Sequence, residues 1–173
     1  VAEMLMAKAG VRQTIYCPAF PDNGRRVFMG NLFVNETPLA ESSMKDHPLT
    51  PMRDSNVMRL LAPQVAGSVG LVSLPVIAMG ALAIQARLAA LNEQGVAHIV
   101  VDALNNDDLQ HVATACCDME LLTGGSALTL ALPELYLQGG LLTENAEKRS
   151  SPTLDLKAIV LAGSVSAMTN LQV

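Results

Sequence analysis

Residues Val96–Asp102 read VAHIVVD, an apolar run that only His98 interrupts and that a carboxylate closes. Near-continuous apolar runs of this length are typical of parallel strands that are buried on both faces. His98 lies in the middle of the run, and we interpret it as a core histidine whose polar atoms have partners inside the protein. The stretch therefore predicts an α/β domain built on a parallel sheet.

Helix and strand signals alternate on both sides of this run. Thr14–Cys17 and Gly70–Leu74 are predicted as further strands. One helix ends at Gly95, and another follows the run with Asp107 or Asp108 as its N-cap. The apolar positions that indicate these helices are Ile84, Leu88 and Leu91 in the first and Leu109, Val112, Ala113 and Cys116 in the second. This alternation implies a doubly wound parallel sheet with right-handed crossovers.

The composition disfavours several classes of protein. The chain has 173 residues, of which 50% are hydrophobic, and its net charge is −5, so we expect no nucleic-acid partner. Its three cysteines (Cys17, Cys116 and Cys117) have neither disulfide-framework nor zinc-site spacing, which favours a cytoplasmic location and no protein metal site. Residues 65–86 are uncharged but contain glycine, serine and proline, which favours a strand, a loop and a helix start over a membrane span.

The segment from Cys17 to Ser55 differs from the rest because prolines and turn residues are concentrated in it. Within it, Arg26–Met29 and Leu32–Val34 flank Gly30-Asn31 and predict a β-hairpin. Long connections in compact domains are usually functional or disordered. This one also holds all three phenylalanines of the chain, so we predict an ordered, functional segment.

Several polar residues in and after this segment are candidates for ligand binding. Arg25 follows the turn pair Asn23-Gly24, and its guanidinium suits a carboxylate or phosphate, with a solvated hairpin arginine as the alternative. Asp54 or Ser55 is placed to cap the helix that follows or to orient a polar ligand. His47 has no evident partner and is interpreted as a surface or loop-packing residue.

Asp102 and two glycine–serine turns complete the candidate set. Asp102 ends the buried strand, where a carboxylate can hold a sugar hydroxyl or a metal ion, or cap the turn toward Asn105. Gly124, Gly125 and Ser126 form a turn between a strand and a helix that favours an anion. Gly163-Ser164-Val165-Ser166 repeats that arrangement, and two such turns facing each other suit phosphoryl transfer.

The domain organisation follows from a polar stretch near the C-terminus. Residues 144–155 (ENAEKRSSPTLD) predict a linker between residues 1–143 and a second α/β domain that begins at residue 156. Ala158–Leu161 is predicted as the first strand of that domain, and residues 156–173 then hold only this strand and the turn after it.

The blocks PAFPDNGR, MGNLFVNETPLAES, HPLTPMRDSN, TGGSAL and VLAGSVSAMTNLQV occur in an order that resembles the four-carbon acid sugar kinases. The HPLTPM form is most similar to their 3-oxo-tetronate branch. The resemblance implies a sugar-acid-binding N-terminal domain and an ATP-binding C-terminal domain. It assigns Gly163, Ser164, Ser166 and Thr169 to the ATP side, although the family commonly has Cys where Val165 stands. Arg25, Asp54 and Ser55 match the substrate-domain motifs, and the family's paired aspartates are expected upstream of Val1.

The leading hypothesis is an ATP- and Mg²⁺-dependent kinase that phosphorylates the terminal hydroxyl of a four-carbon sugar acid. Its general base is unassigned, and this piece of the family pattern is not expected to catalyse alone. A non-catalytic sugar-acid-binding or regulatory module is the alternative. An NAD-linked dehydrogenase is disfavoured because the chain has no GxGxxG motif. The high apolar content also suggests a homo-oligomer.

Overall fold

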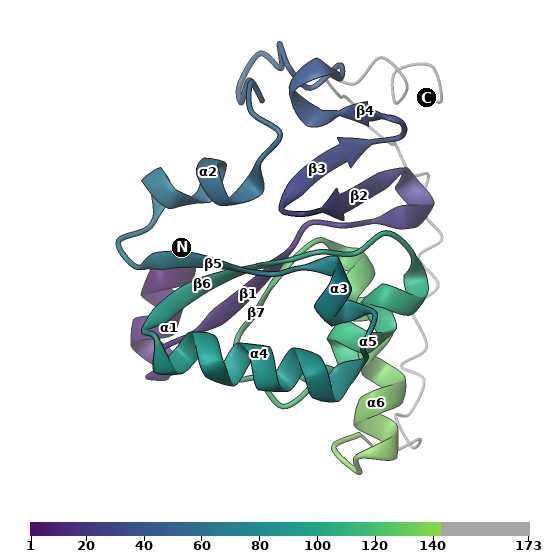
Figure 1. Cartoon of the computed structure of the whole chain (residues 1–173). Helices are drawn as coiled ribbons and strands as arrows, with labels where there is room; N and C mark the ends of the chain where they lie inside the picture. The colour runs from purple at the N-terminus through teal and green to yellow at the C-terminus, as the bar shows by residue number, and fades with distance from the viewer. Residues whose placement is uncertain (143–173) are drawn as a thin grey trace, which may run out of the picture. The chain divides into compact units, whose positions relative to one another are not determined.

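The computed structural model describes residues 1–142, and Val1–Leu142 form one compact unit (Figure 1). The predicted linker 144–155 and the predicted start of a second domain at 156–173 lie outside the described residues. Gly163, Ser164, Ser166 and Thr169, which the family resemblance places on the ATP side, therefore also lie outside them.

A parallel sheet of four strands forms the centre of the unit. The strands are β1 (Thr14–Cys17), β5 (Ser68–Val72), β6 (Val96–Val101) and β7 (Leu122–Gly124), in the order β5-β6-β1-β7. The VAHIVV run forms the interior strand β6, in which Ile99, Val100 and Val101 are fully buried. The prediction of an α/β domain built on a parallel sheet is therefore confirmed. β5 ends two residues earlier than predicted, because Leu74-Pro75 begins α3 (Leu74–Ile77).

Two longer helices cover this sheet. α4 (Ala81–Glu93) contacts β5 and β6, and α5 (Asn106–Cys116) packs beside α4 (Figure 1). The apolar positions predicted for both helices are all buried: Ile84, Leu88, Leu91, Leu109, Val112, Ala113 and Cys116. The spacing of apolar residues thus identified the core-facing side of each helix.

The N-cap of α5 is Asn105, and the prediction of Asp107 or Asp108 was wrong. The Asn105 side chain accepts the Asp108 N–H at 2.8 Å, while the Asp108 carboxylate accepts the Asn105 N–H at 3.3 Å. This reciprocal capping box satisfies two N–H groups that have no partner inside the helix. Asp108 is therefore buried as the third residue of the helix and not as its cap.

His98 is a buried core residue with both ring nitrogens engaged, as predicted. Its Nε2 lies 3.2 Å from Oε1 of Glu3 in α1 (Ala2–Ala9), and its Nδ1 lies 3.0 Å from the Tyr16 hydroxyl in β1. Glu3 also accepts the Ala66 N–H, which lowers the pKa of its carboxyl group and favours the carboxylate. A carboxylate only accepts, so Nε2 carries a proton, and in the neutral ring Nδ1 accepts from the Tyr16 hydroxyl. The network ties α1 to β1 and β6.

A separate antiparallel sheet is formed by β2 (Arg25–Phe28), β3 (Asn31–Val34) and β4 (Thr37–Pro38). The predicted hairpin is thus present, but its turn is Met29-Gly30 and not Gly30-Asn31. Phe28 pairs with Asn31, and Met29 and Gly30 both have positive φ, 49° and 73°. Two successive positive φ angles define the type I′ turn that joins twisted strands. The third strand was not predicted.

Shorter elements complete the described residues. The segment between β1 and β5 includes the 3₁₀ turns η1 (Pro21–Asn23), η2 (Leu39–Glu41) and η3 (Ala62–Gln64) and the helix α2 (Val57–Leu61). η4 (Ser126–Leu130) and α6 (Leu132–Gln138) follow β7. Residues 65–86 contain a strand and the start of α4, as expected, but the short helix α3 stands where a loop was expected. Among residues 1–142, every helix is too short or too polar to cross a bilayer.

Gly124 brings β7 against the end of β1. Its φ is +152°, and a Cβ built on it would lie 2.5 Å from the Cys17 carbonyl oxygen. Gly95 also has a positive φ, +74°, but a Cβ there would meet nothing within 4 Å. The two glycines therefore separate the cost of backbone strain from the cost of steric overlap.

We expect Gly124→Ala to lower the free energy of unfolding by roughly 3 kcal/mol, because strain and overlap with an unyielding backbone atom add. Gly95→Ala, the matched control, should cost only about 1 kcal/mol, the strain alone. Urea unfolding of the two variants measures both values. Equal losses would contradict the close approach of β7 to β1.

Candidate functional site

The four parallel strands end at Cys17, Val72, Val101 and Gly124, so the segments after these residues meet at one edge of the sheet. Open α/β sheets bind ligands at this carboxyl edge. Figure 1 shows the hairpin β2–β3 lying beyond this edge.

Asp102 fastens the hairpin to the edge. Its side chain is fully buried, Oδ2 accepts the Met29 N–H at 2.7 Å, and Oδ1 accepts the Gly30 N–H at 2.9 Å. Oδ2 also accepts the Leu74 N–H at the start of α3, at 2.9 Å. Burial raises the pKa of Asp102, and the three N–H donors, which favour the carboxylate, oppose that rise. One carboxyl group thus joins β6, the hairpin turn and α3.

Asp102 was predicted either to hold a sugar hydroxyl or a metal ion, or to cap the turn toward Asn105. The turn toward Asn105 is capped by Asp108, which accepts the Leu104 N–H at 2.8 Å and the Asn105 N–H at 3.3 Å. A direct contact between Asp102 and a ligand stays a prediction. In the structure both of its oxygens are engaged by backbone N–H groups.

Further hydrogen bonds join β2 to the residues that follow β6. Val27 and Ala103 exchange two backbone hydrogen bonds, at 2.9 and 3.1 Å. Arg26 Nε donates to the Leu104 carbonyl oxygen at 3.1 Å, and Asn106 Nδ2 donates to Asp22 Oδ1, also at 3.1 Å. The hairpin is therefore a fixed extension of the segment that follows β6.

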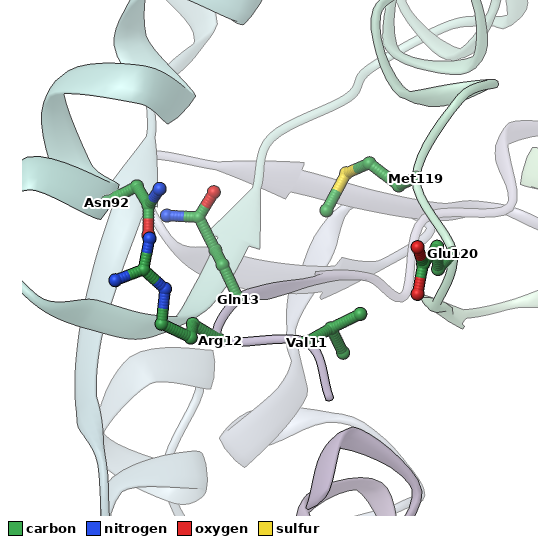
Figure 2. Close-up of a pocket in the computed structure, with 6 residues that line it drawn as sticks. All are labelled: Val11, Arg12, Gln13, Asn92, Met119 and Glu120. Carbon is green, nitrogen blue, oxygen red and sulfur yellow. The ribbon is translucent and has the colours of Figure 1, made fainter. Parts of the chain in front are cut away.

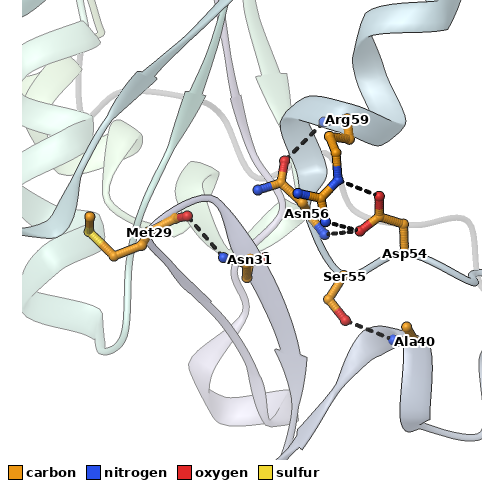
Figure 3. A network of polar contacts seen from close by, with 7 residues as sticks. All are labelled: Met29, Asn31, Ala40, Asp54, Ser55, Asn56 and Arg59. Atoms are coloured by element: carbon orange, nitrogen blue, oxygen red, sulfur yellow. Dashed lines mark hydrogen bonds and ion pairs between the residues drawn. The ribbon is translucent and has the colours of Figure 1, made fainter.

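The loop before α2 packs against the same hairpin (Figure 3). Asn56 is the N-cap of α2, since its Oδ1 accepts the Arg59 N–H at 3.0 Å, and the prediction of Asp54 or Ser55 as cap was wrong. Asp54 instead forms a two-point ion pair with Arg59, at 2.6 and 2.7 Å, which holds its pKa at about 2. Ser55 Oγ accepts the Ala40 N–H at 2.9 Å. The side chains of Asp54 and Ser55 thus tie this loop to α2 and η2.

Gly30 is the point at which two predicted regions meet. Its N–H donates to Asp102, while its carbonyl oxygen accepts the Val57 N–H at 2.8 Å. Asp102 and the Asp54–Asn56 segment therefore lie near the turn of the hairpin. Arg25 lies at the other end of β2, opposite Val34. Arg25 lies three residue steps along the strand from Phe28, roughly 10 Å.

Arg25 and the Gly124–Ser126 turn flank β1 at this edge. Arg25 is exposed and opens β2 after Gly24, which has a left-handed conformation (φ 70°). Gly125 donates its N–H to the Cys17 carbonyl oxygen at 2.8 Å, so this group is already paired. The element that follows is the five-residue 3₁₀ turn η4, and the Ser126 side chain is exposed. Anion binding by this turn stays a prediction.

A hollow at the carboxyl edge includes polar residues that were not among the predicted site residues. It measures about 220 Å³ between α5 and the segment after β7. Asn106, Gln110 and Glu134 supply its polar side chains, beside Leu109, Ala127, Leu130 and Ala131. Amide and carboxylate groups on helix surfaces are common, and only the packing of two distant helices assembles them, so no sequence signal marks them.

A larger hollow, of about 260 Å³, lies at the opposite edge of the sheet (Figure 2). Its lining residues precede β1 and β7 or end α4: Val11, Arg12, Gln13, Asn92, Met119 and Glu120. Gln13 Nε2 donates to the Leu88 and Val96 carbonyl oxygens and is a structural residue. The amino edge is not where open α/β sheets bind their ligands. We therefore place the candidate site at the carboxyl edge, despite the smaller hollow there.

No group of three or more His, Cys, Asp or Glu side chains within residues 1–142 is arranged to hold a metal ion. The polar groups at the carboxyl edge are a guanidinium, amides, a hydroxyl and carboxylates. Such groups suit an organic acid with several hydroxyls, because a guanidinium binds carboxylates and amides bind hydroxyls.

Because Asp102 accepts three backbone N–H groups, even its replacement by asparagine is expected to destabilise the protein. Asp102→Asn keeps the size of the side chain but turns one acceptor into a donor that faces a backbone N–H. We expect a loss of about 3 kcal/mol in the free energy of unfolding, with faster amide exchange at Met29, Gly30 and Leu74. Asp107→Asn, an exposed control in α5, should cost less than about 1 kcal/mol. Similar losses in the two variants, with unchanged exchange, would rule out the fastening role.

Comparison with known proteins places this geometry in a family. Residues 1–132 match the family model described as a sugar-binding N-terminal domain. A protein of Cupriavidus necator named 3-oxo-tetronate kinase is 45% identical over 173 residues, which is all of this chain and 40% of that protein. The chain thus spans about 40% of the length of such a relative.

Two solved structures are similar in fold. A Haemophilus influenzae protein shares 43% identity and a TM-score of 0.76 over 81% of this chain and 34% of its own. A Bordetella bronchiseptica protein with bound citrate, described as a domain-swapped dimer, shares 29% identity and a TM-score of 0.56 over 74% of this chain and 30% of its own. The chain belongs to the sugar-binding N-terminal domain family, as its resemblance to the four-carbon acid sugar kinases predicted.

Proposed function

We propose that this chain is the sugar-acid-binding part of an ATP-dependent kinase that phosphorylates the terminal hydroxyl of a four-carbon sugar acid, with 3-oxo-tetronate as the leading substrate. The observation that carries the proposal is 45% identity along all 173 residues to a protein named 3-oxo-tetronate kinase. The match of residues 1–132 to a sugar-binding domain supports the assignment of this part to the substrate.

The carboxyl edge offers groups of the right chemistry for this substrate. The exposed Arg25 guanidinium suits the carboxylate of the sugar acid, because it can donate two parallel hydrogen bonds. Asn106, Gln110 and Glu134 can bind hydroxyls in the hollow between α5 and the segment after β7, and the Ser126 hydroxyl lies in that segment. The citrate bound to the Bordetella bronchiseptica relative, a hydroxy acid with several carboxylates, supports a site for this class of molecule.

The proposal assigns the nucleotide to residues beyond this site. Gly163, Ser164, Ser166 and Thr169 are proposed to contact ATP, and Mg²⁺ would bridge its phosphates, as in other phosphoryl transfers. In the reaction the substrate hydroxyl oxygen bonds to the γ-phosphorus, ADP leaves, and a base that is not assigned takes the hydroxyl proton. We also propose a cytoplasmic location and a homo-oligomer, the latter supported by the dimer of the Bordetella bronchiseptica relative.

Arg25→Ala is expected to weaken binding of 3-oxo-tetronate to the chain about tenfold or more, because a charge-assisted pair with the carboxylate is lost. Arg12→Ala is the matched control, since Arg12 is an exposed arginine at the amino edge. Isothermal titration calorimetry compares the affinities of the two variants. If both variants bind as tightly as the unmodified chain, Arg25 does not hold the carboxylate.

Catalysis is tested on the complete protein that contains this chain, with a coupled assay for ADP. Release of ADP that depends on both Mg-ATP and a four-carbon sugar acid is the expected result. Sugar-acid binding without ADP release would favour a non-catalytic binding or regulatory module. Neither binding nor ADP release with any four-carbon sugar acid would overturn the proposed function.

A further inference from the structure

We infer that His47 is a positioning residue, whose neutral imidazole holds the loop at residues 42–52 in shape and makes the presentation of the Asp54–Asn56 segment depend on pH. The consequence for ligand binding rests on the proposed function. The effect on the loop itself does not.

Three donors converge on one ring nitrogen of His47. Its Nδ1 lies 3.3 Å from the Leu49 nitrogen, 3.1 Å from the Thr50 nitrogen and 3.1 Å from the Thr50 Oγ1. Backbone N–H groups can only donate, so Nδ1 must be the acceptor and carries no proton. The Thr50 hydroxyl also lies within hydrogen-bond distance of this atom, whose single lone pair the three donors share. In the neutral ring Nε2 then carries the proton. The geometry thus fixes the tautomer.

The loop built around this nitrogen is closed by its own backbone. Met52 and His47 both donate their N–H groups to the Met44 carbonyl oxygen, at 3.1 and 3.2 Å. Ser42 Oγ accepts the Met44 N–H at 3.2 Å. Pro48 and Pro51 restrict φ on either side of Leu49-Thr50, which favours the return of these N–H groups toward the ring.

The closed loop leads directly into the segment that packs on the hairpin. Two residues after Met52 comes Asp54, which pairs with Arg59. The Ser55 carbonyl oxygen then accepts the Leu32 N–H at 2.8 Å, and Ser55 Oγ accepts the Ala40 N–H at 2.9 Å. The shape of the 42–52 loop therefore controls the direction from which the chain enters this segment.

A second proton on the ring would remove the acceptor. Nδ1–H would then point at two N–H donors, so those hydrogen bonds would be lost and replaced by repulsion. The charged groups nearest in the chain are Lys45, Asp46 and Arg53, and all three are exposed. In the described part of the chain, every hydrogen bond of the ring is made within its own loop. No ion pair there offsets the added charge.

The loop is tested by NMR on the whole chain between about pH 8 and pH 5, the range in which histidine gains its second proton. We expect the Leu49 and Thr50 amides to shift and exchange faster as the pH falls. In His47→Asn an amide oxygen can accept in place of Nδ1 at every pH, so these changes should disappear. His47→Ala should show the open loop throughout, and His111→Asn, in α5, should leave the response of the loop unchanged. Leu49 and Thr50 amides that do not respond as the ring is protonated would overturn the inference.

Binding supplies the second measurement. We expect the affinity of the unmodified chain for 3-oxo-tetronate to fall by roughly threefold or more from about pH 8 to pH 5, beyond any fall in His47→Asn. If the loop responds but both proteins show the same pH dependence of affinity, the positioning role is wrong while the proposed function stands. If no protein binds any four-carbon sugar acid at either pH, the proposed function fails, and the NMR experiment alone decides the role of His47 in the loop.

Discussion

One buried carboxylate holds the two sheets of this domain together. Asp102 accepts three backbone N–H groups, two from the turn of the antiparallel hairpin and one from the start of α3. An aspartate this deeply buried is costly unless its oxygens are satisfied, and the three donors meet that requirement. They also explain the turn itself. Met29 has a positive φ, unusual for a residue with a side chain, and this conformation directs two successive N–H groups toward one carboxylate.

Features that repeat along the chain could be predicted from the sequence, and those that depend on one distant contact could not. The apolar run at Val96–Val101 and the periodic faces of α4 and α5 predicted the sheet and its core, because burial imposes a regular spacing. The turn was misplaced by one residue because Gly30-Asn31 is the better local turn pair, and Asp102 overrides that preference. The caps of α2 and α5 are asparagines that lie within three residues of the predicted caps, which were Asp54 or Ser55 and Asp107 or Asp108. Short polar side chains close together in the sequence do not reveal which one turns inward.

The same limit applies to the site. Two of the ligand candidates also organise the protein, because Asp54 pairs with Arg59 and Ser55 Oγ accepts the Ala40 N–H. His47, which was expected to be a surface or loop-packing residue, gathers donors from its own loop. At the carboxyl edge Arg25 and Ser126 are exposed, and Asn106, Gln110 and Glu134 line the hollow beside α5. Within that hollow Asn106 also donates to Asp22, and Glu134 accepts from Gln138. The turn-rich segment therefore acts mainly by building a rigid support, on which few side chains need to face the substrate.

The central claim is that a sugar acid binds at the carboxyl edge, beside the hairpin that Asp102 holds, and not in the larger hollow at the amino edge. Backbone amide NMR spectra of the chain, recorded as 3-oxo-tetronate is added, test it most directly. We expect saturable shifts at Arg25–Arg26, Asn105–Asn106 and Gly125–Ser126. Shifts confined to Arg12, Gln13, Met119 and Glu120 would contradict this account and place the ligand in the amino-edge hollow.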